Sequence, residues 1–210
     1  MINAEERKMF HSYADQPDGL PVARGAKGNL FACPYDSIRD DNITYMISRW
    51  ETQNNWDSYF GHRKDISPDW FLPNCEPHTV LRLRELDSSP TKQDKAKGEC
   101  VFGLGKDAVL NIHIWQFENA ELRDEINSFW GQEPGLRSSA LYPGNLFVSG
   151  FEAIEKENQL VALNGWESMD IFLAYRQMRR DTAPEPVQPF LADDVMVQSK
   201  IVEGLEDPRV

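Results

Sequence analysis

The sequence has few of the patterns that identify disulfide-rich, zinc-binding, membrane or secreted proteins. Its three cysteines, Cys33, Cys75 and Cys100, show no CxxC spacing, so we expect reduced thiols, as in a cytosolic protein. No run of 18 apolar residues suggests a membrane span, and the N-terminal residues lack the apolar stretch of a signal peptide. With 40% hydrophobic residues among 210, the chain can bury a substantial core. These features predict a soluble, globular, cytoplasmic protein.

Basic residues are also scarce. The 22 Lys and Arg are outnumbered by 34 Asp and Glu, and the formal charge of −12 repels phosphate backbones and anionic lipids. We therefore expect no nucleic-acid partner and no membrane partner. The four histidines, His11, His62, His78 and His113, lie far apart without HxH or HxxxH spacing, which predicts no metal site. The sequence also lacks a complete phosphate-binding loop and a GxSxG nucleophile motif.

An internal duplication is the main feature that the sequence does contain. Trp50 and Trp166 are 116 positions apart, and the same offset aligns residues 28–31 with 144–147 without a gap. Residues 3–73 share 21 identities with residues 119–189. Unrelated segments of this length would share about four. We predict a first repeat over residues 1–86, a linker over 87–100 and a second, complete repeat over 101–210.

Each repeat contains a strand that leads directly into a helix. In the second repeat the apolar run 160–166 ends at Trp166-Glu167-Ser168, and apolar residues at helical spacing follow as far as Tyr175. Ser168 suits a helix N-cap, because its hydroxyl can accept a backbone N–H. The first repeat shows the same pattern over 43–60.

The remaining elements follow from alternation, helical spacing and turn residues. We expect helices over 3–13 and 119–130, strands over 29–33, 79–84, 109–115, 145–149 and 195–201, and connections over 21–28, 62–77 and 183–189. The strand 109–115 has no counterpart in the first repeat, because 116 positions earlier lies at or before the first residue. Either the first repeat lacks its leading strand, or another segment replaces it. A tandem repeat can form its own pseudo-dimer, whereas an unpaired strand edge favours a homodimer.

The order of elements and the Trp-Glu-Ser and Trp-Glu-Thr corners resemble the dimeric α+β-barrel superfamily, in particular antibiotic-biosynthesis-monooxygenase-like domains. The resemblance covers the second repeat and all of the first except its leading strand. It implies an α+β fold in which tandem ferredoxin-like repeats form a pseudo-dimeric α+β barrel, with antiparallel sheets and helices outside.

The resemblance also implies a pocket between the sheet and the helices. Members of this family use it for cofactor-independent oxygenation of aromatic substrates, for polyketide cyclisation, for lactone isomerisation or for haem chemistry. By position, the implied catalytic residues are His113, Asn164 and Trp166, and the implied substrate-binding residues are Asn111, Trp115 and Tyr175. The first repeat departs from this set, since Ser48 stands at the position of Asn164.

The residue types fit such chemistry. An imidazole such as that of His113 can take a proton from a phenol near neutral pH. Asn111 and Asn164 can donate to an oxyanion, and Trp115 and Trp166 can stack on an aromatic ring. Four of the site residues also have a structural interpretation. Trp166 and Tyr175, which are duplicated as Trp50 and Tyr59, can be core residues, Asn164 can cap a turn, and His113 can be an ordinary interior or surface histidine.

Three classes of function therefore remain open. The first is a small enzyme of natural-product metabolism acting on an aromatic or polyketide-like small molecule, either a monooxygenase without cofactor or a cyclase or lyase. The second is a haem-binding dehydratase or haem-degrading relative, in which His62 or His113 would serve as the ligand. The third is a noncatalytic, degenerate paralogue.

Overall fold

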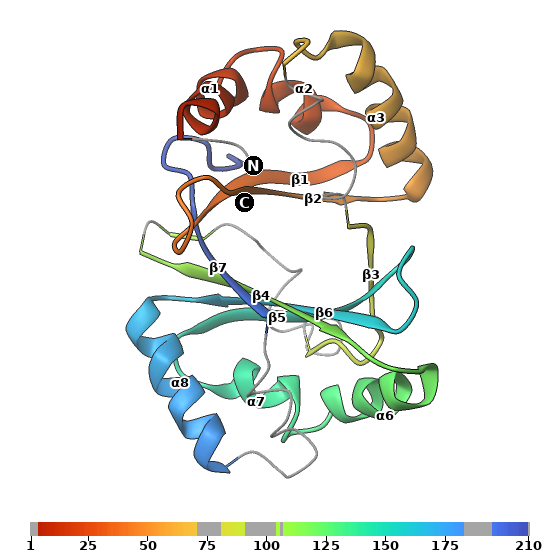
Figure 1. Cartoon of the computed structure of the whole chain (residues 1–210), viewed down its shortest axis with the longest axis vertical. Coiled ribbons are helices and arrows are strands. Elements are labelled where there is room, and N and C mark those ends of the chain that lie inside the picture. The colour runs from red at the N-terminus through yellow and green to blue at the C-terminus, as the bar shows by residue number, and fades with distance from the viewer. Residues whose placement is uncertain (1–3, 71–80, 91–103, 106, 183–194, 210) are drawn as a thin grey trace. The chain divides into compact units, whose positions relative to one another are not determined.

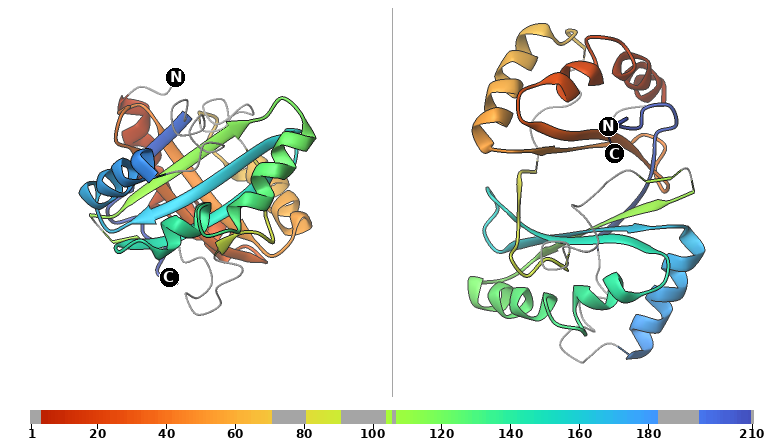
Figure 2. Two further views of the ribbon diagram at one scale, coloured as in Figure 1. Left: turned by 90° about the horizontal axis from the view of Figure 1, so that it is seen from below. Right: turned by 180° about the vertical axis from the view of Figure 1, so that it is seen from behind.

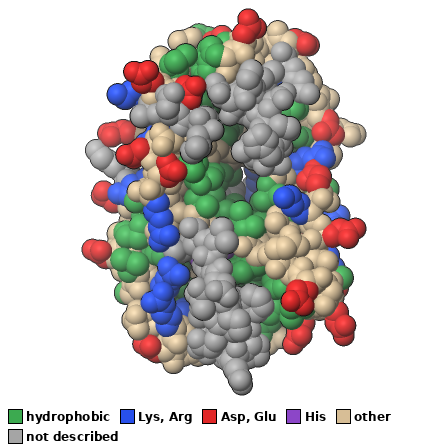
Figure 3. All heavy atoms as spheres, in the orientation of Figure 1, with side chains coloured by type: hydrophobic (Ala, Val, Ile, Leu, Met, Phe, Trp, Pro, Cys, Tyr) green, Lys and Arg blue, Asp and Glu red, His purple; other side chains and the backbone are tan. Residues whose placement is uncertain are grey.

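The computed structural model describes residues 4–70, 81–90, 104–105, 107–182 and 195–209. The chain divides into two compact units. Unit 1 comprises Met1–Val80 with Ser199–Val210, and unit 2 comprises Leu81–Gln198. Within the described ranges, no helix has the length and apolarity that crossing a membrane requires. Acidic and basic side chains are interspersed over the face drawn in Figure 3.

Unit 2 is an antiparallel sheet with helices on one face (Figures 1 and 2). Its strands lie in the order β7-β4-β6-β5-β3. They are β3 (Leu83–Glu85), β4 (Val109–Gln116), β5 (Asn145–Ala153), β6 (Gln159–Trp166) and the beginning of β7 (Val195–Ile201). The covering helices are α6 (Ala120–Trp130), α7 (Leu136–Leu141) and α8 (Met169–Thr182). The pairs β4–β6, β5–β6 and β3–β5 are antiparallel.

The alternation of β4 places its polar and aromatic residues on the face that the helices cover. Asn111 lies opposite Asn164, and Trp115 lies opposite Leu160 in the β4–β6 ladder. Cross-strand partners project from the same face of a sheet. Trp115, Leu160 and residues of the helices belong to one apolar cluster, which also contains Leu86, Phe117, Leu122, Ile126, Trp130, Leu136, Ala140, Val148 and Ala162. The core of unit 2 therefore lies between this face and the helices.

The two long helices of unit 2 begin at side-chain caps. The Asn119 side chain accepts the Leu122 N–H at 2.9 Å, and Ser168 Oγ accepts the Ile171 N–H at 3.3 Å. Such caps pair backbone donors that the first turn leaves without partners. The predicted role of Ser168 is confirmed.

Unit 1 has the strand order β2-β1-β7 and carries its helices on one face of the sheet (Figure 1). Its elements are α1 (Ala4–Ala14), α2 (Leu20–Gly25), β1 (Asn29–Ser37), β2 (Thr44–Trp50), α3 (Gln53–Ile66) and the end of β7. A small apolar cluster joins the helices to the C-terminal segment through Ala14, Leu20, Val202 and Leu205, with Phe10 packed against it.

A buried ion pair fixes the C-terminal segment in unit 1. The Asp207 carboxylate, whose side chain has no exposed surface, accepts the Ala32 N–H at 3.0 Å and pairs with Arg209 at 2.6 Å. Arg209 also donates to the carbonyl of Arg24 and to the side chain of Asn29. The last residues described are therefore an integral part of unit 1.

Local geometry recurs at the offset of 116 positions. Gly28 and Gly144 have φ of 77° and 81°, values that favour glycine. Arg63 donates to the Asp18 carbonyl at 2.5 Å. At the corresponding place in unit 2, Arg179 donates to the Pro134 carbonyl at 2.7 Å.

The strand that ends each predicted repeat lies wholly or partly in the other repeat's compact unit: β3 lies in unit 2, and the end of β7 lies in unit 1. Leu83 pairs with Ala153 in unit 2, and Ser199 pairs with Ser37 in unit 1, so both partners differ by 116 positions. Each compact unit thus contains all or part of the last strand of the other repeat. The predicted repeat boundaries, which follow sequence order, stay a prediction.

The α+β class with antiparallel sheets and helices is confirmed. Two of the predicted connections were wrong. The expected connection 21–28 contains helix α2, which begins at Leu20 with Pro21 in its first turn, and the expected loop 62–77 begins inside α3, which continues to Ile66. Six residues are too few to show helical periodicity, and the prolines after Ile66 obscured the end of α3. Residues 71–77, 91–100 and 183–189 of the predicted connections and linker lie outside the described residues.

Candidate functional site

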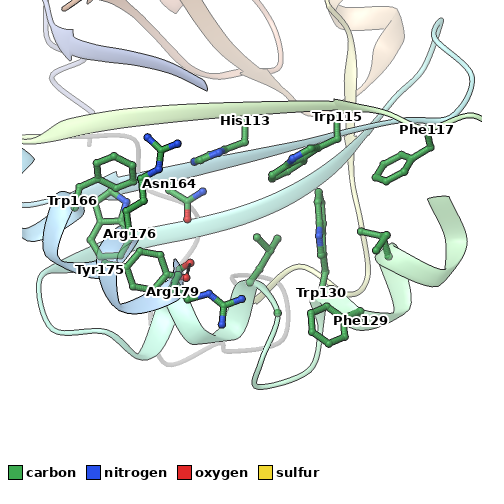
Figure 4. Close-up of a pocket in the computed structure, with 15 residues that line it drawn as sticks. His113, Trp115, Phe117, Phe129, Trp130, Asn164, Trp166, Tyr175, Arg176 and Arg179 are labelled. Carbon is green, nitrogen blue, oxygen red and sulfur yellow. Dashed lines mark hydrogen bonds between the residues drawn. The ribbon is translucent and has the colours of Figure 1, made fainter. Parts of the chain in front are cut away.

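Unit 2 contains a pocket of about 90 Å³ between its sheet and its helices. Figure 4 shows it with polar groups of Asn164, Trp166, Tyr175 and Arg176 toward one end and Trp130, Phe117 and Phe129 toward the other. The complete lining is His113, Trp115, Phe117, Ile126, Phe129, Trp130, Gly135, Leu136, Ser139, Asn164, Trp166, Phe172, Tyr175, Arg176 and Arg179.

The structure brings five of the six predicted site residues to this pocket. His113 and Trp115 come from β4, Asn164 and Trp166 from β6, and Tyr175 from α8. The sixth, Asn111, is fully buried opposite Asn164 and is not among the lining residues. The catalytic and binding roles assigned to all six stay predictions.

Several buried polar atoms of the pocket have no hydrogen-bond partner within the described residues. They are Asn164 Oδ1, Trp166 Nε1 and Trp115 Nε1. Asn164 is 5% exposed and Trp166 has no exposed surface. Leaving a buried donor or acceptor unpaired typically costs about 1–3 kcal/mol. A ligand that accepts from Trp166 and donates to Asn164 would remove that cost.

The aromatic wall beside Asn164 is held by α7 and α8. The ring of Trp166 packs against that of Tyr175 and against Phe172. The Tyr175 hydroxyl is hydrogen-bonded to Ser139 Oγ at 2.6 Å and to Ser138 Oγ at 3.0 Å. These bonds fix the ring that supports Trp166.

At the corresponding place in unit 1, the tryptophan is hydrogen-bonded to a residue of its own strand. Trp50 Nε1 donates to Ser48 Oγ at 2.9 Å, so this indole N–H has a partner. The positions of Ser138 and Ser139 are occupied by Val22 and Ala23. The described residues of unit 1 therefore keep the aromatic frame and include none of the unpaired buried side-chain atoms.

A histidine and two arginines supply the titratable and charged groups of the pocket. The imidazole of His113 stacks on Trp115, with ring centroids 5.4 Å apart and an interplanar angle of 13°. Arg179 is buried and donates to the Pro134 carbonyl. In Figure 4 the side chain of Arg176 reaches from α8 toward the sheet, on the side of the pocket where Asn164 lies. An acidic hydroxyl group would meet a base and a positive charge there.

Other candidate groups lie elsewhere. His62 is exposed on α3 in unit 1. Cys33 is fully buried, and burial raises the pKa of its thiol to about 12, which makes it a poor nucleophile at neutral pH. No cluster of three metal-ligating side chains occurs in the described part of the chain.

The sequence analysis missed Ser138, Ser139, Arg176 and Trp130. A comparison of the repeats could have found them, because 116 positions earlier stand Val22, Ala23, Phe60 and Ala14. A polar or bulky residue that appears in only one copy of a duplicated frame indicates a role outside that frame.

Comparisons with known proteins identify the fold. No family model matches the chain, and no curated protein matches its sequence. Solved structures do match. A "putative monooxygenase" from Lactobacillus acidophilus NCFM superposes with a TM-score of 0.59 at 12% identity, covering 96% of this chain and 89% of that one. An anthrone oxidase-like protein superposes with a TM-score of 0.60 at 13% identity, covering 93% and 83%.

A third match, which carries the same name as the first and comes from Fusobacterium nucleatum subsp. nucleatum ATCC 25586, gives a TM-score of 0.60 at 10% identity over 97% and 88%. At these identities the likeness concerns the fold alone. The chain therefore has the α+β fold of monooxygenase-like structures, as the resemblance predicts.

Proposed function

We propose that the chain is a monooxygenase without a cofactor that oxidises an electron-rich phenol in the pocket of unit 2. The observation that carries the proposal is the unpaired pair of Trp166 Nε1 and Asn164 Oδ1, buried beside each other on one strand. Burying a polar group that has no hydrogen-bond partner destabilises the folded state, so a purely structural role does not explain this pair. A phenolic ligand uses both, because its deprotonated oxygen accepts from Trp166 and a second hydroxyl donates to Asn164.

The proposed reaction begins with transfer of the phenol proton to His113. The ring of the bound phenol lies against the stacked side chains of His113 and Trp115. Its phenolate oxygen is stabilised by the Trp166 N–H and by the positive charge of Arg176. Dioxygen then reacts with the ring carbon opposite the phenolate. One oxygen atom stays as a carbonyl and the other leaves as water, so a dihydroxybenzene and O₂ give a hydroxyquinone and water.

The experiment is oxygen consumption with resorcinol and related phenols, followed by mass spectrometry with ¹⁸O₂. We expect one labelled oxygen atom in the product, and loss of turnover in Trp166→Phe, which keeps a ring and removes the N–H. Trp50→Phe is the matched control in unit 1 and should keep turnover. Equal turnover in both variants would contradict the proposal.

The same assay distinguishes the proposed monooxygenase from two alternative functions. A cyclase or lyase would turn over its substrate without O₂. A noncatalytic paralogue, which the small and largely aromatic pocket also supports, would show neither reaction. The pocket does not support a haem site, because its volume of about 90 Å³ is well below the roughly 300–1,000 Å³ of sites for drug-sized ligands, and His62 lies outside the pocket lining.

A further inference from the structure

Trp130 is a large side chain that lines the pocket and has no equivalent in unit 1. It ends helix α6, is 6% exposed, and packs edge-to-face on Trp115 with ring centroids 5.3 Å apart. At the same place in the first repeat stands Ala14. The aromatic frame shared by the two repeats therefore does not require a large side chain here.

Gly150 on β5 provides the space that Trp130 occupies. A Cβ atom at this position would lie 2.8 Å from Trp130 Cε3 and 3.0 Å from Cζ3. Carbon atoms do not approach so closely without displacement, so any other residue would push the indole into the pocket. Glycine in a strand interior is otherwise unfavourable, and it often marks a close approach of a neighbouring group. Trp130 and Gly150 form a matched pair.

The size of the pocket limits what can enter. A cavity of roughly 150 Å³ accepts benzene in an engineered protein, and typical sites for drug-sized ligands have about 300–1,000 Å³. At about 90 Å³, this pocket can admit one aromatic ring after small side-chain shifts. A ligand with three fused rings could enter only if one of the lining side chains were replaced by a smaller one.

We propose that Trp130 determines the size of the ligand and restricts the pocket to phenols with a single ring. Figure 4 shows Trp130 at the end of the pocket away from Asn164 and Trp166. A ligand whose hydroxyl groups pair with those two residues directs its ring toward Trp130, so Trp130 limits the length of the ring system. The phenolic class rests on the proposed function, whereas the size limit rests on the geometry of Trp130 and Gly150.

Equilibrium dialysis with resorcinol, 1-naphthol and anthrone tests the proposal without requiring turnover. We expect the wild-type protein to bind resorcinol at least tenfold more tightly than anthrone. Trp130→Ala should increase the affinity for 1-naphthol relative to that for resorcinol by tenfold or more, and the less disruptive Trp130→Leu should shift this ratio in the same direction. Gly150→Ala should weaken resorcinol binding. Trp50→Phe, in unit 1, is the control and should leave all three affinities unchanged.

Three results would overturn the size limit: anthrone binding equal to resorcinol binding in the wild-type protein, no resorcinol binding, or unchanged selectivity in folded Trp130→Leu. Thermal melting of each variant establishes that it is folded. Selective binding of resorcinol without oxygen consumption would reject the proposed function and leave the size limit standing.

Discussion

The ring centroids of Tyr175 and Trp166 lie 4.7 Å apart, and the two ring planes make an angle of 33°. In unit 1, Tyr59 lies 4.9 Å from Trp50 at 31°. The two pairs are nearly identical, so the ring contact belongs to the frame that both repeats share. What differs is the hydroxyl, which two serines hold in unit 2 only.

The first prediction tests whether the hydroxyl of Tyr175 contributes to ligand binding, apart from the ring contact that both repeats share. Tyr175→Phe keeps the ring, leaves the buried Ser139 hydroxyl without its 2.6 Å partner, and should lower the free energy of unfolding by about 1–2 kcal/mol. It should also weaken resorcinol binding several-fold, because the support of Trp166 loosens. Tyr59→Phe is the control and should leave binding unchanged. Urea denaturation and dialysis measure both effects, and equal loss of binding in the two variants would contradict the assignment.

The second prediction concerns the unpaired side-chain oxygen of Asn164. Asn164→Leu replaces a buried unpaired acceptor with an apolar group of similar volume, so it should raise the free energy of unfolding by about 1 kcal/mol and abolish oxygen consumption. Ser48→Ala at the equivalent place should have the opposite effect on stability, because it removes the partner of Trp50 Nε1. A destabilised Asn164→Leu with full turnover would show that this residue is structural.

The third prediction follows from the ion pair of Asp207. Burial alone would raise the pKa of this carboxyl, but hydrogen bonds from Arg209 and from the Ala32 N–H outweigh it and lower the pKa to about 2. A lowered pKa stabilises the folded state above the ordinary pKa of about 3.9, and this contribution is lost as the pH falls toward 2.

Asp207→Asn should therefore cost about 2 kcal/mol at pH 7 and flatten the dependence of stability on pH between about 5 and 2. Chemical denaturation across this range measures it. Parallel pH profiles of the variant and the wild-type protein would mean that Asp207 is not the group responsible.

A fourth prediction concerns the reactivity of Cys33. Its pKa of about 12 and complete burial predict no alkylation by iodoacetamide at pH 8 in the folded protein, and rapid alkylation in urea. Peptide mass spectrometry resolves this cysteine from the other two. Modification of Cys33 under native conditions would indicate that β1 opens readily.

The candidate site was predictable from sequence where it depends on alternation. The two-residue period of β4 places His113 and Trp115 on one face, and the run before the Trp-Glu-Ser corner brings Asn164 and Trp166 to the adjacent strand. Asn111 shares that face and still does not reach the pocket. Periodicity determines the face of a strand, but the position along the strand relative to the helices depends on tertiary packing.

Elements that depend on long-range partners were not predictable in the same way. Helix α2 is short, and its buried Leu20 packs with Val202 and Leu205, more than 180 residues later in the sequence. Among the described residues of the predicted strand 79–84, β3 begins at Leu83, because its pairing with β5 covers Leu83–Glu85. Pro34 lies inside β1 although proline commonly ends a strand.

The exchange of terminal strands has a consequence for synthesis of the protein on the ribosome. The sheet of unit 1 acquires β7, and its helices acquire Leu205 and Asp207, only after nearly the whole polypeptide has been translated. Nascent chains that end before this segment would hold α1, α2 and α3 over an incomplete core, exposed to proteases and chaperones. Unit 2 receives β3 before its own first strand emerges, but the beginning of β7 lies next to β4, so the sheet of unit 2 is also incomplete until β7 has been translated.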